Sequence, residues 1–191
     1  MSGMQIKIAA AANQLFAERG FAEPGVEAIR EAAGVSIRTL YKHYPSREAM
    51  IVGALAHRHA LYLEHLREGK PAQAGQRAVF HLFDRLESWM AQQGTRGCLF
   101  VHALASHTES AAIHGEVERN KQGVRDEIAT RLSASQRPLL PSLFLLHEGV
   151  TAAASNLGAA AACDQAKVVV HQLFAESPMV APRRRRALST S

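Results

Sequence analysis

The sequence predicts an all-α protein with about nine helices, and three observations support this prediction. Alanine is abundant and occurs in runs at residues 9–12 and 159–162, which favours helix over sheet. Apolar residues recur at helical spacing along most of the 191 residues. No segment alternates apolar and polar residues in the way that a half-buried strand does.

Three short helices are predicted in the first 46 residues, over about 4–19, 26–33 and 37–43. Gly20 and Gly34 are suited to end the first two, because glycine accepts the backbone conformation of a helix C-terminus. Ser36 is a good N-cap for the third, and Pro45 ends that helix at the residue before it.

Longer helices are predicted after Ser46, over about 47–67, 76–93 and 112–133, with a shorter one after Cys98. A nearly uncharged segment follows at 139–162, and a last helix is expected at 164–176. We therefore divide the chain into domains at 1–46 and 47–177, and we expect a disordered Arg-rich tail at 178–191. The helix that begins at residue 47 is expected to touch both domains.

The net charge of +5 and the pI of about 9.6 are weak evidence for nucleic-acid binding. Four of the positive charges are Arg183–Arg186 in the tail, so the rest of the chain carries only +1. The local balance is more informative, because residues 30–47 have an excess of +3. The charged side chains there are Arg30, Arg38, Lys42 and Arg47 against Glu31.

Two short helices joined by a tight glycine turn, the second one basic, form the helix-turn-helix arrangement. Such a second helix fits the major groove of DNA, where its side chains reach base edges and phosphates. Arg38 is placed for a bidentate contact to guanine, whereas hydroxyl and ammonium groups are suited to backbone oxygens. Each basic residue taken alone is more often simply solvated, so the spacing of the whole set carries the hypothesis.

The segments LFAERGF (15–21) and AAGVSIRTLYKHYPSREAM (32–50) resemble the N-terminal domain of the TetR family of transcriptional regulators. Positions that match the family pattern are Leu15, Phe16, Gly20, Phe21, Ala33, Gly34, Val35, Ser36, Thr39, Leu40, Tyr41, His43, Ser46 and Glu48. Tyr44 and Arg47 replace the usual Phe and Lys. The predicted DNA-contacting residues are Ser36, Arg38, Thr39, Tyr41, Lys42, His43, Tyr44 and Arg47.

Three departures from the family pattern lie just upstream. Pro24 and Gly25 stand where a pair of hydroxyl residues usually caps the second helix, so that phosphate contact is expected to be missing. Ala28 replaces a frequent Asp, and Arg30 replaces a small residue where the two motif helices cross. We expect Arg30 to extend outward and to offer a replacement phosphate contact.

The resemblance implies that residues 47–177 bind a small effector and form a homodimer through the last two long helices. Small residues at Gly149, Ala153, Asn156 and Ala160 follow near-heptad spacing in the segment 139–162, whose one charge is Glu148. Small residues let helices approach closely, which suits a subunit interface. The alternative is an ordinary buried helix within one chain.

Aromatic and polarizable side chains concentrate between residues 80 and 102, and the predicted effector-binding residues are Phe83, Trp89, Met90, Cys98, Phe100 and His102. For any single one of them, ordinary core is the better interpretation. Cys98 follows Arg96 and is expected near a helix N-terminus, and both features favour a reactive thiolate. A thiol sensor is therefore one hypothesis for Cys98, and a structural cysteine is the other.

The sequence shows no catalytic constellation, no metal-ligand spacing among its ten histidines, no cofactor motif and no membrane span. Taken with the resemblance, it predicts a cytoplasmic, one-component transcriptional regulator that is not an enzyme. We expect a repressor that binds a pseudo-palindromic operator and is released by a small, mostly apolar effector. The competing interpretation is a helical ligand-binding or enzymatic protein that has lost DNA binding.

Overall fold

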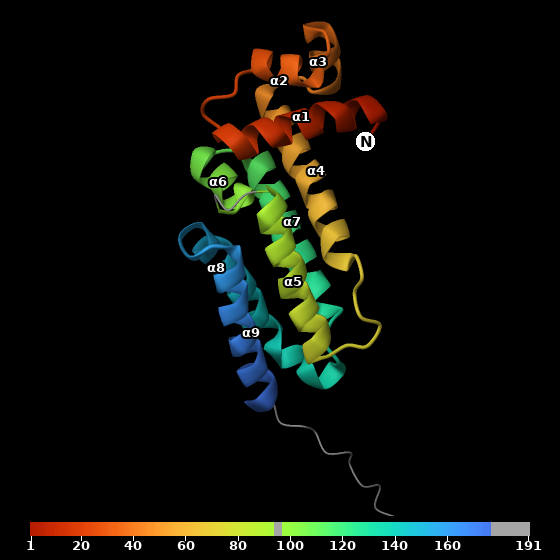
Figure 1. Ribbon diagram of the computed structural model, residues 1–191. Helices are drawn as coiled ribbons and strands as arrows, with labels where there is room; N and C mark the ends of the chain where they lie inside the picture. Colours follow the sequence, from red (N-terminus) through yellow and green to blue (C-terminus); the bar gives the residue numbers. More distant parts are fainter. Residues whose placement is uncertain (94–96, 177–191) are drawn as a thin grey trace, which may run out of the picture.

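The computed structural model describes residues 1–93 and 97–176. Within these residues the chain forms nine α-helices and one 3₁₀ helix, which confirms the predicted all-α class (Figure 1). The elements are α1 (Gly3–Arg19), α2 (Val26–Ala33), α3 (Ile37–His43), α4 (Arg47–Arg67), α5 (Gln76–Gln93), α6 (Leu99–Ser106), α7 (Ala111–Ala129), η1 (Ala134–Leu139), α8 (Leu140–Leu157) and α9 (Ala159–Glu176).

The first three helices gather at one end of the molecule, and α8 and α9 lie side by side away from them (Figure 1). In α1 the apolar face predicted from the sequence is buried, with Ile8 and Phe16 almost fully enclosed. Ile29 of α2 and Leu40 of α3 complete this core, and neither is exposed to solvent. The short helices α2 and α3 are therefore held by packing on α1 and on each other, since helices of this length are marginal alone.

Helix α4 contributes to two separate hydrophobic clusters. Its first half places Met50 and Leu55 in the cluster of α1–α3, while Tyr62 and Leu66 lie in the cluster of α5 and α7–α9. One continuous helix therefore links the two cores. Phe100 of α6 also packs in the first cluster, which shows that the N-terminal core extends beyond residue 46.

Three predicted helices have different limits in the structure. The helix expected to reach residue 133 ends at Ala129, and Ser133 starts the 3₁₀ helix with a capping box. The segment expected to be one helix over 139–162 is divided at Gly158, which has a φ of 82°. Glycine accepts this backbone conformation without the strain that other residues suffer. The last helix consequently begins at Ala159 rather than at Asp164.

The tail predicted to be disordered, residues 178–191, lies outside the described residues. In the part of the chain that is described, no helix is both long and apolar enough to cross a bilayer.

Candidate DNA-binding surface and effector cavity

The turn between α2 and α3 is built by local interactions. Gly34 adopts the left-handed conformation with φ 58° and ψ 46°, which permits the sharp change of direction. The Ser36 hydroxyl caps α3 by accepting a hydrogen bond from the Thr39 amide at 3.1 Å, as the sequence predicted. Arg30 donates to the carbonyl oxygen of Val35 at 3.3 Å and fixes the turn from the side of α2.

Helix α3 presents a polar and basic face to solvent. Ser36, Arg38, Tyr41 and Lys42 are exposed, and the Tyr41 side chain is 45% accessible despite its large ring. Thr39 and His43 are half-buried and lie on the same helix. These residues form a continuous donor-rich surface that a phosphate backbone and the base edges beside it can meet.

Tyr44, one of the predicted contact residues, is instead a core residue. Its side chain is only 7% accessible, and its hydroxyl donates to the carbonyl oxygen of Gln5 in α1 at 3.1 Å. Burial raises the pKa of the Tyr44 phenol. The ring rests against Gly53 of α4, where a Cβ atom would overlap it. The geometry therefore gives Tyr44 the role of fixing α3 on α1 and α4.

Arg47 is likewise engaged within the protein. Its guanidinium donates to the carbonyl oxygens of Phe21 and Pro24, and it lies 6.0 Å from the centre of the Phe16 ring. These contacts tie the loop before α2 to the start of α4. Gly25 at the N-cap of α2 makes no side-chain capping bond, so the carbonyl contacts of Arg47 hold this loop while the first N–H groups of α2 have no side-chain cap.

Arg30 also has partners within the domain. Its guanidinium pairs with Glu27 at 2.6 Å and with Glu31 at 3.4 Å, and 29% of its side chain is accessible. The side chain does extend toward solvent, but two carboxylates already compensate its charge. A phosphate contact by Arg30 stays a prediction, and these two carboxylates oppose it.

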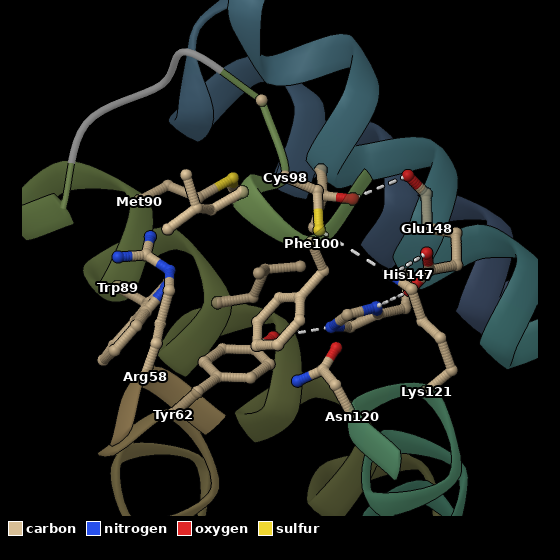
Figure 2. A pocket seen from close by; sticks show the side chains of 14 residues that line it. Arg58, Tyr62, Trp89, Met90, Cys98, Phe100, Asn120, Lys121, His147 and Glu148 are labelled. Atoms are coloured by element: carbon tan, nitrogen blue, oxygen red, sulfur yellow. Dashed lines mark hydrogen bonds and ion pairs between the residues drawn. The ribbon is translucent and has the colours of Figure 1, made fainter. Parts of the chain in front are cut away.

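A second candidate site is a small cavity of about 50 Å³ where α4–α8 meet (Figure 2). The side chains around it are Arg58, Tyr62, Leu86, Trp89, Met90, Gly97, Cys98, Leu99, Phe100, Asn120, Lys121, His147, Glu148 and Thr151. Of the predicted effector-binding residues, Trp89, Met90, Cys98 and Phe100 line this cavity. Phe83 is buried in the core elsewhere and His102 is exposed, so neither takes part in the lining.

Sequence reasoning missed the polar half of the cavity. Arg58, Asn120, Lys121 and His147 come from three different helices, and no local motif links them. One signal was present, because Glu148 is the one charge in an otherwise uncharged helix. Such an isolated charge needs a partner or a function when its helix packs against others.

One wall of the cavity is a hydrogen-bonded chain. The Tyr62 hydroxyl lies 2.6 Å from Nε2 of His147, and Nδ1 of His147 lies 3.2 Å from Glu148, which also pairs with Lys121. Burial opposes ionisation of Glu148, but the hydrogen bonds from His147 and Lys121 outweigh it and lower the pKa to about 2. Burial raises the pKa of the Tyr62 phenol well above its ordinary value.

The opposite wall is formed by Arg58, Trp89 and Met90 (Figure 2). The Arg58 guanidinium carbon lies 5.3 Å from the centre of the Trp89 ring. Its Nη1 atom donates long hydrogen bonds of 3.4 Å to the side-chain oxygens of Asn13 in α1 and Gln93 in α5. This wall thus joins the cavity to the first helix of the chain.

Helices α8 and α9 expose apolar side chains that no other described part of the chain covers. Leu145, Leu157 and Val168 are 70%, 60% and 54% accessible. The small residues Gly149 and Ala160, singled out in the sequence, also lie on these two helices, and both are exposed, Gly149 on α8 and Ala160 on α9. Exposed apolar groups of this size on adjacent helices are typical of an interaction surface.

The glycine turn, the capped basic helix α3 and its exposed donors form a helix-turn-helix, the arrangement in which such a helix can enter the major groove of DNA. Comparison with protein families indicates which family of regulators this N-terminal part resembles. Residues 8–54 match the family model described as "Bacterial regulatory proteins, tetR family". The N-terminal part of the chain is thus that of a TetR-family transcriptional regulator, a family of regulatory proteins rather than enzymes.

Solved structures share the fold over nearly the whole chain. E. coli NemR in its reduced form has a TM-score of 0.76 at 21% identity and covers 94% of this chain and 100% of its own. A TetR-family regulator from Streptomyces coelicolor has a TM-score of 0.76 at 20% identity, covering 92% and 90%. The multidrug binding protein EbrR, complexed with imidazole, has 0.66 at 17%, covering 88% of each. No curated protein matches the sequence.

Proposed function

We propose that this regulator is a cytoplasmic, homodimeric repressor that binds a pseudo-palindromic operator and is released by a small, mostly apolar effector. The observation that carries the proposal is the position of α4. This helix starts directly after the exposed helix α3, packs in both cores and provides Arg58 and Tyr62 to the cavity. A molecule in the cavity therefore acts on the helix that positions α3.

The proposed operator contacts are those side chains of α3 that have no engagement within the protein core. Arg38 is suited to a guanine edge, while Tyr41 and Lys42 are suited to phosphate oxygens. Thr39 and His43 lie at the margin of the same surface. Tyr44 and Arg47 support this surface indirectly, because they hold α3 and α4 in place.

The proposed dimer surface is the uncovered face of α8 and α9. Its exposed leucines and valines lose contact with water when a second copy packs against them, which favours association. Small residues on the same helices permit close approach. A two-fold axis there would present two α3 helices to DNA, and a symmetric protein reads a symmetric operator.

An effector would act through the distance or angle between the two α3 helices. Entry into a cavity of about 50 Å³ requires its walls to move apart, and α4 is one of those walls. Displacement of α4 would then move α3 away from the spacing that fits two successive turns of the major groove. Operator affinity falls as a result.

Operator binding tests this proposal directly. An operator fragment selected from random duplex DNA is titrated with the wild-type protein and with the double variant Tyr41→Ala, Lys42→Ala. We expect the wild type to bind with a steep salt dependence, and the double variant to lose most of its affinity. Arg77→Ala is the control, since Arg77 is a cation of α5 outside the proposed DNA surface.

Equal affinity of the double variant and the control would contradict the assignment of α3. Failure of the wild type to select any duplex would instead favour a helical ligand-binding protein that has lost DNA binding.

The structure also favours one further means of control, through Cys98. Its Sγ atom accepts a hydrogen bond from Lys121 at 3.7 Å at the edge of the effector cavity, and the side chain is half-buried. The other cysteine, Cys163, is fully buried, and burial raises the pKa of its thiol to about 11. Cys98 is thus the thiol that an electrophile can reach. A Cys98→Ser variant that still releases the operator with electrophiles would refute this role.

A further inference from the structure

The Arg58 guanidinium is a buried positive charge that faces the effector cavity. Only 7% of the residue is accessible. Its two hydrogen bonds, to Asn13 and Gln93, are long and go to neutral amide oxygens. Figure 2 shows the guanidinium between Trp89 and Met90 in the lining of the cavity, and its Nε and Nη2 atoms make no hydrogen bond to residues 1–93 or 97–176.

No carboxylate among residues 1–93 and 97–176 lies within 4 Å of Arg58, whereas buried charges in proteins are normally paired. Other ion pairs of the chain show the contrast, since the fully buried Arg131 is paired with Glu127. Burial lowers the pKa of the Arg58 guanidinium, and only the weak acids Cys98 and Tyr62 oppose this effect. Arginine nevertheless stays protonated in proteins, so the cavity retains an uncompensated cation.

The carboxylate that lines this cavity already has partners within the protein. Glu148 lies in the opposite wall, where Lys121 and His147 bind it. The lining carries one positive charge in excess, because Arg58 and Lys121 are positive and Glu148 is negative. A ligand that brings one negative charge would neutralise the cavity.

The shape and chemistry of the lining indicate the rest of the ligand. The rings of Tyr62, Trp89 and Phe100 surround the space beside the guanidinium. Aromatic faces of this kind favour a flat apolar body, and the planar guanidinium binds a carboxylate through two parallel hydrogen bonds.

We propose that the cavity binds a small, flat organic carboxylate through Arg58, and that this ligand takes the guanidinium away from Asn13. Asn13 belongs to α1, is 8% accessible and accepts its hydrogen bond from Arg58 at 3.4 Å. A carboxylate accepts a charge-assisted hydrogen bond that is stronger than the one to an amide. The ligand therefore loosens a contact between α1 and α4, and this coupling rests on the proposed function.

Binding is measured through the single tryptophan of the chain, Trp89, whose ring lies against Arg58. The probe is benzoate, with benzamide as the neutral molecule of nearly the same shape and sodium sulfate at matched ionic strength as the inorganic anion. We expect benzoate at millimolar concentration to change Trp89 emission in a saturable way and to raise the melting temperature. Benzamide and sulfate should do neither.

Variants of Arg58 and a control then assign the site. Arg58→Met is expected to fold, because it replaces an unpaired buried charge by an apolar side chain of similar length, and to bind benzoate about tenfold or more weakly. Arg58→Lys keeps the charge without the planar fork and should bind with intermediate affinity. Arg77→Ala should bind like the wild type. The site is refuted if benzamide or sulfate binds as benzoate does, if Arg58→Met binds benzoate as the wild type does, or if benzoate gives no change at all.

The coupling to DNA is tested separately with Asn13→Ala. This variant should bind benzoate at least as tightly as the wild type, since the competing oxygen is gone, but its operator affinity should respond less to benzoate. If benzoate binds through Arg58 and leaves wild-type operator affinity unchanged, the coupling is wrong while the site stands. If the wild type binds no operator, the proposed function fails, and the fluorescence experiment still decides whether the carboxylate site exists.

Discussion

Gly53 in α4 is the position where adding one methyl group should most clearly separate helix propensity from packing. A Cβ atom at residue 53 would lie 2.8 Å from Cζ and from the hydroxyl oxygen of Tyr44, and nearer still to Cε1. Ordinary contacts between carbon atoms are about 3.5–4.0 Å, so the Tyr44 ring would have to move by about 1 Å or more. That movement stretches the hydrogen bond from Tyr44 to Gln5, which is 3.1 Å long.

The cost of Gly53→Ala can be worked out from three contributions. Overpacking costs about 1–3 kcal/mol, and loss of the Tyr44 hydrogen bond costs about 1 kcal/mol more. Replacing a helical glycine by alanine stabilises the helix by about 1 kcal/mol, which offsets part of this cost. The net destabilisation is therefore about 1–3 kcal/mol, which corresponds to a melting temperature lower by about 3–10 °C for a chain of this size.

Gly115→Ala is the matched control, because Gly115 also lies inside an α-helix but a Cβ atom added there would have no neighbour within 4 Å. Only the gain in helix propensity applies there, so its melting temperature should rise slightly. Thermal unfolding followed by circular dichroism measures both variants. Operator affinity should fall in Gly53→Ala by more than the fraction unfolded explains, since Tyr44 directly follows α3. Equal melting temperatures for the two variants would refute the packing argument.

Two further predictions concern pH and assembly. The pKa of Glu148 in the folded protein is about 2, against an ordinary value of 4.5, so its stabilisation is complete above pH 4.5 and is lost as the pH falls toward 2. This difference corresponds to about 3 kcal/mol at most, and Glu148→Gln should remove that part of the acid dependence in chemical denaturation. Replacing Leu145 or Val168 by Glu should weaken self-association about a hundredfold or more in analytical ultracentrifugation, because a charge would be buried in the proposed dimer surface.

Each of these two predictions has an internal control. Glu118→Gln changes an exposed carboxylate of α7 and should leave the acid dependence unchanged. An identical profile for Glu148→Gln and the wild type would mean that Glu148 gains nothing from Lys121 and His147. Val101→Glu changes an exposed valine of α6, away from α8 and α9, and should not affect association. Association that resists both Leu145→Glu and Val168→Glu would place the subunit interface elsewhere.

The elements that the sequence predicted best are those bounded by local signals. The helices at 26–33, 37–43, 47–67 and 76–93 have the predicted limits in the structure. Ser36 and Ser46 cap two of them, and such caps act within three residues along the chain. The break at Gly158 was missed because an apolar, alanine-rich stretch runs on both sides of it, and apolar periodicity alone does not indicate a bend.

Contacts between distant segments could not be predicted from local sequence signals. Tyr44 and Arg47 have the residue types that bind phosphate, yet one packs against Gly53 and the other binds carbonyl groups near Pro24. Arg131 is fully buried and held by Glu127 and by the carbonyl oxygen of Leu66, although its sequence neighbourhood is polar. In each case a partner lies in another helix or loop.

Helical periodicity, capping and turn chemistry act over a few residues, so the all-α class, the helix-turn-helix register from Gly34 to Ser46 and the family resemblance could be predicted without a structure. Which polar groups meet could be seen only once the helices were packed together. The tertiary structure placed Arg58 against Trp89 and Asn13 and built the chain from Tyr62 to Glu148. The physical reason is that the charge balance of a cavity depends on all the helices packed around it, whereas periodicity along the chain describes one helix at a time.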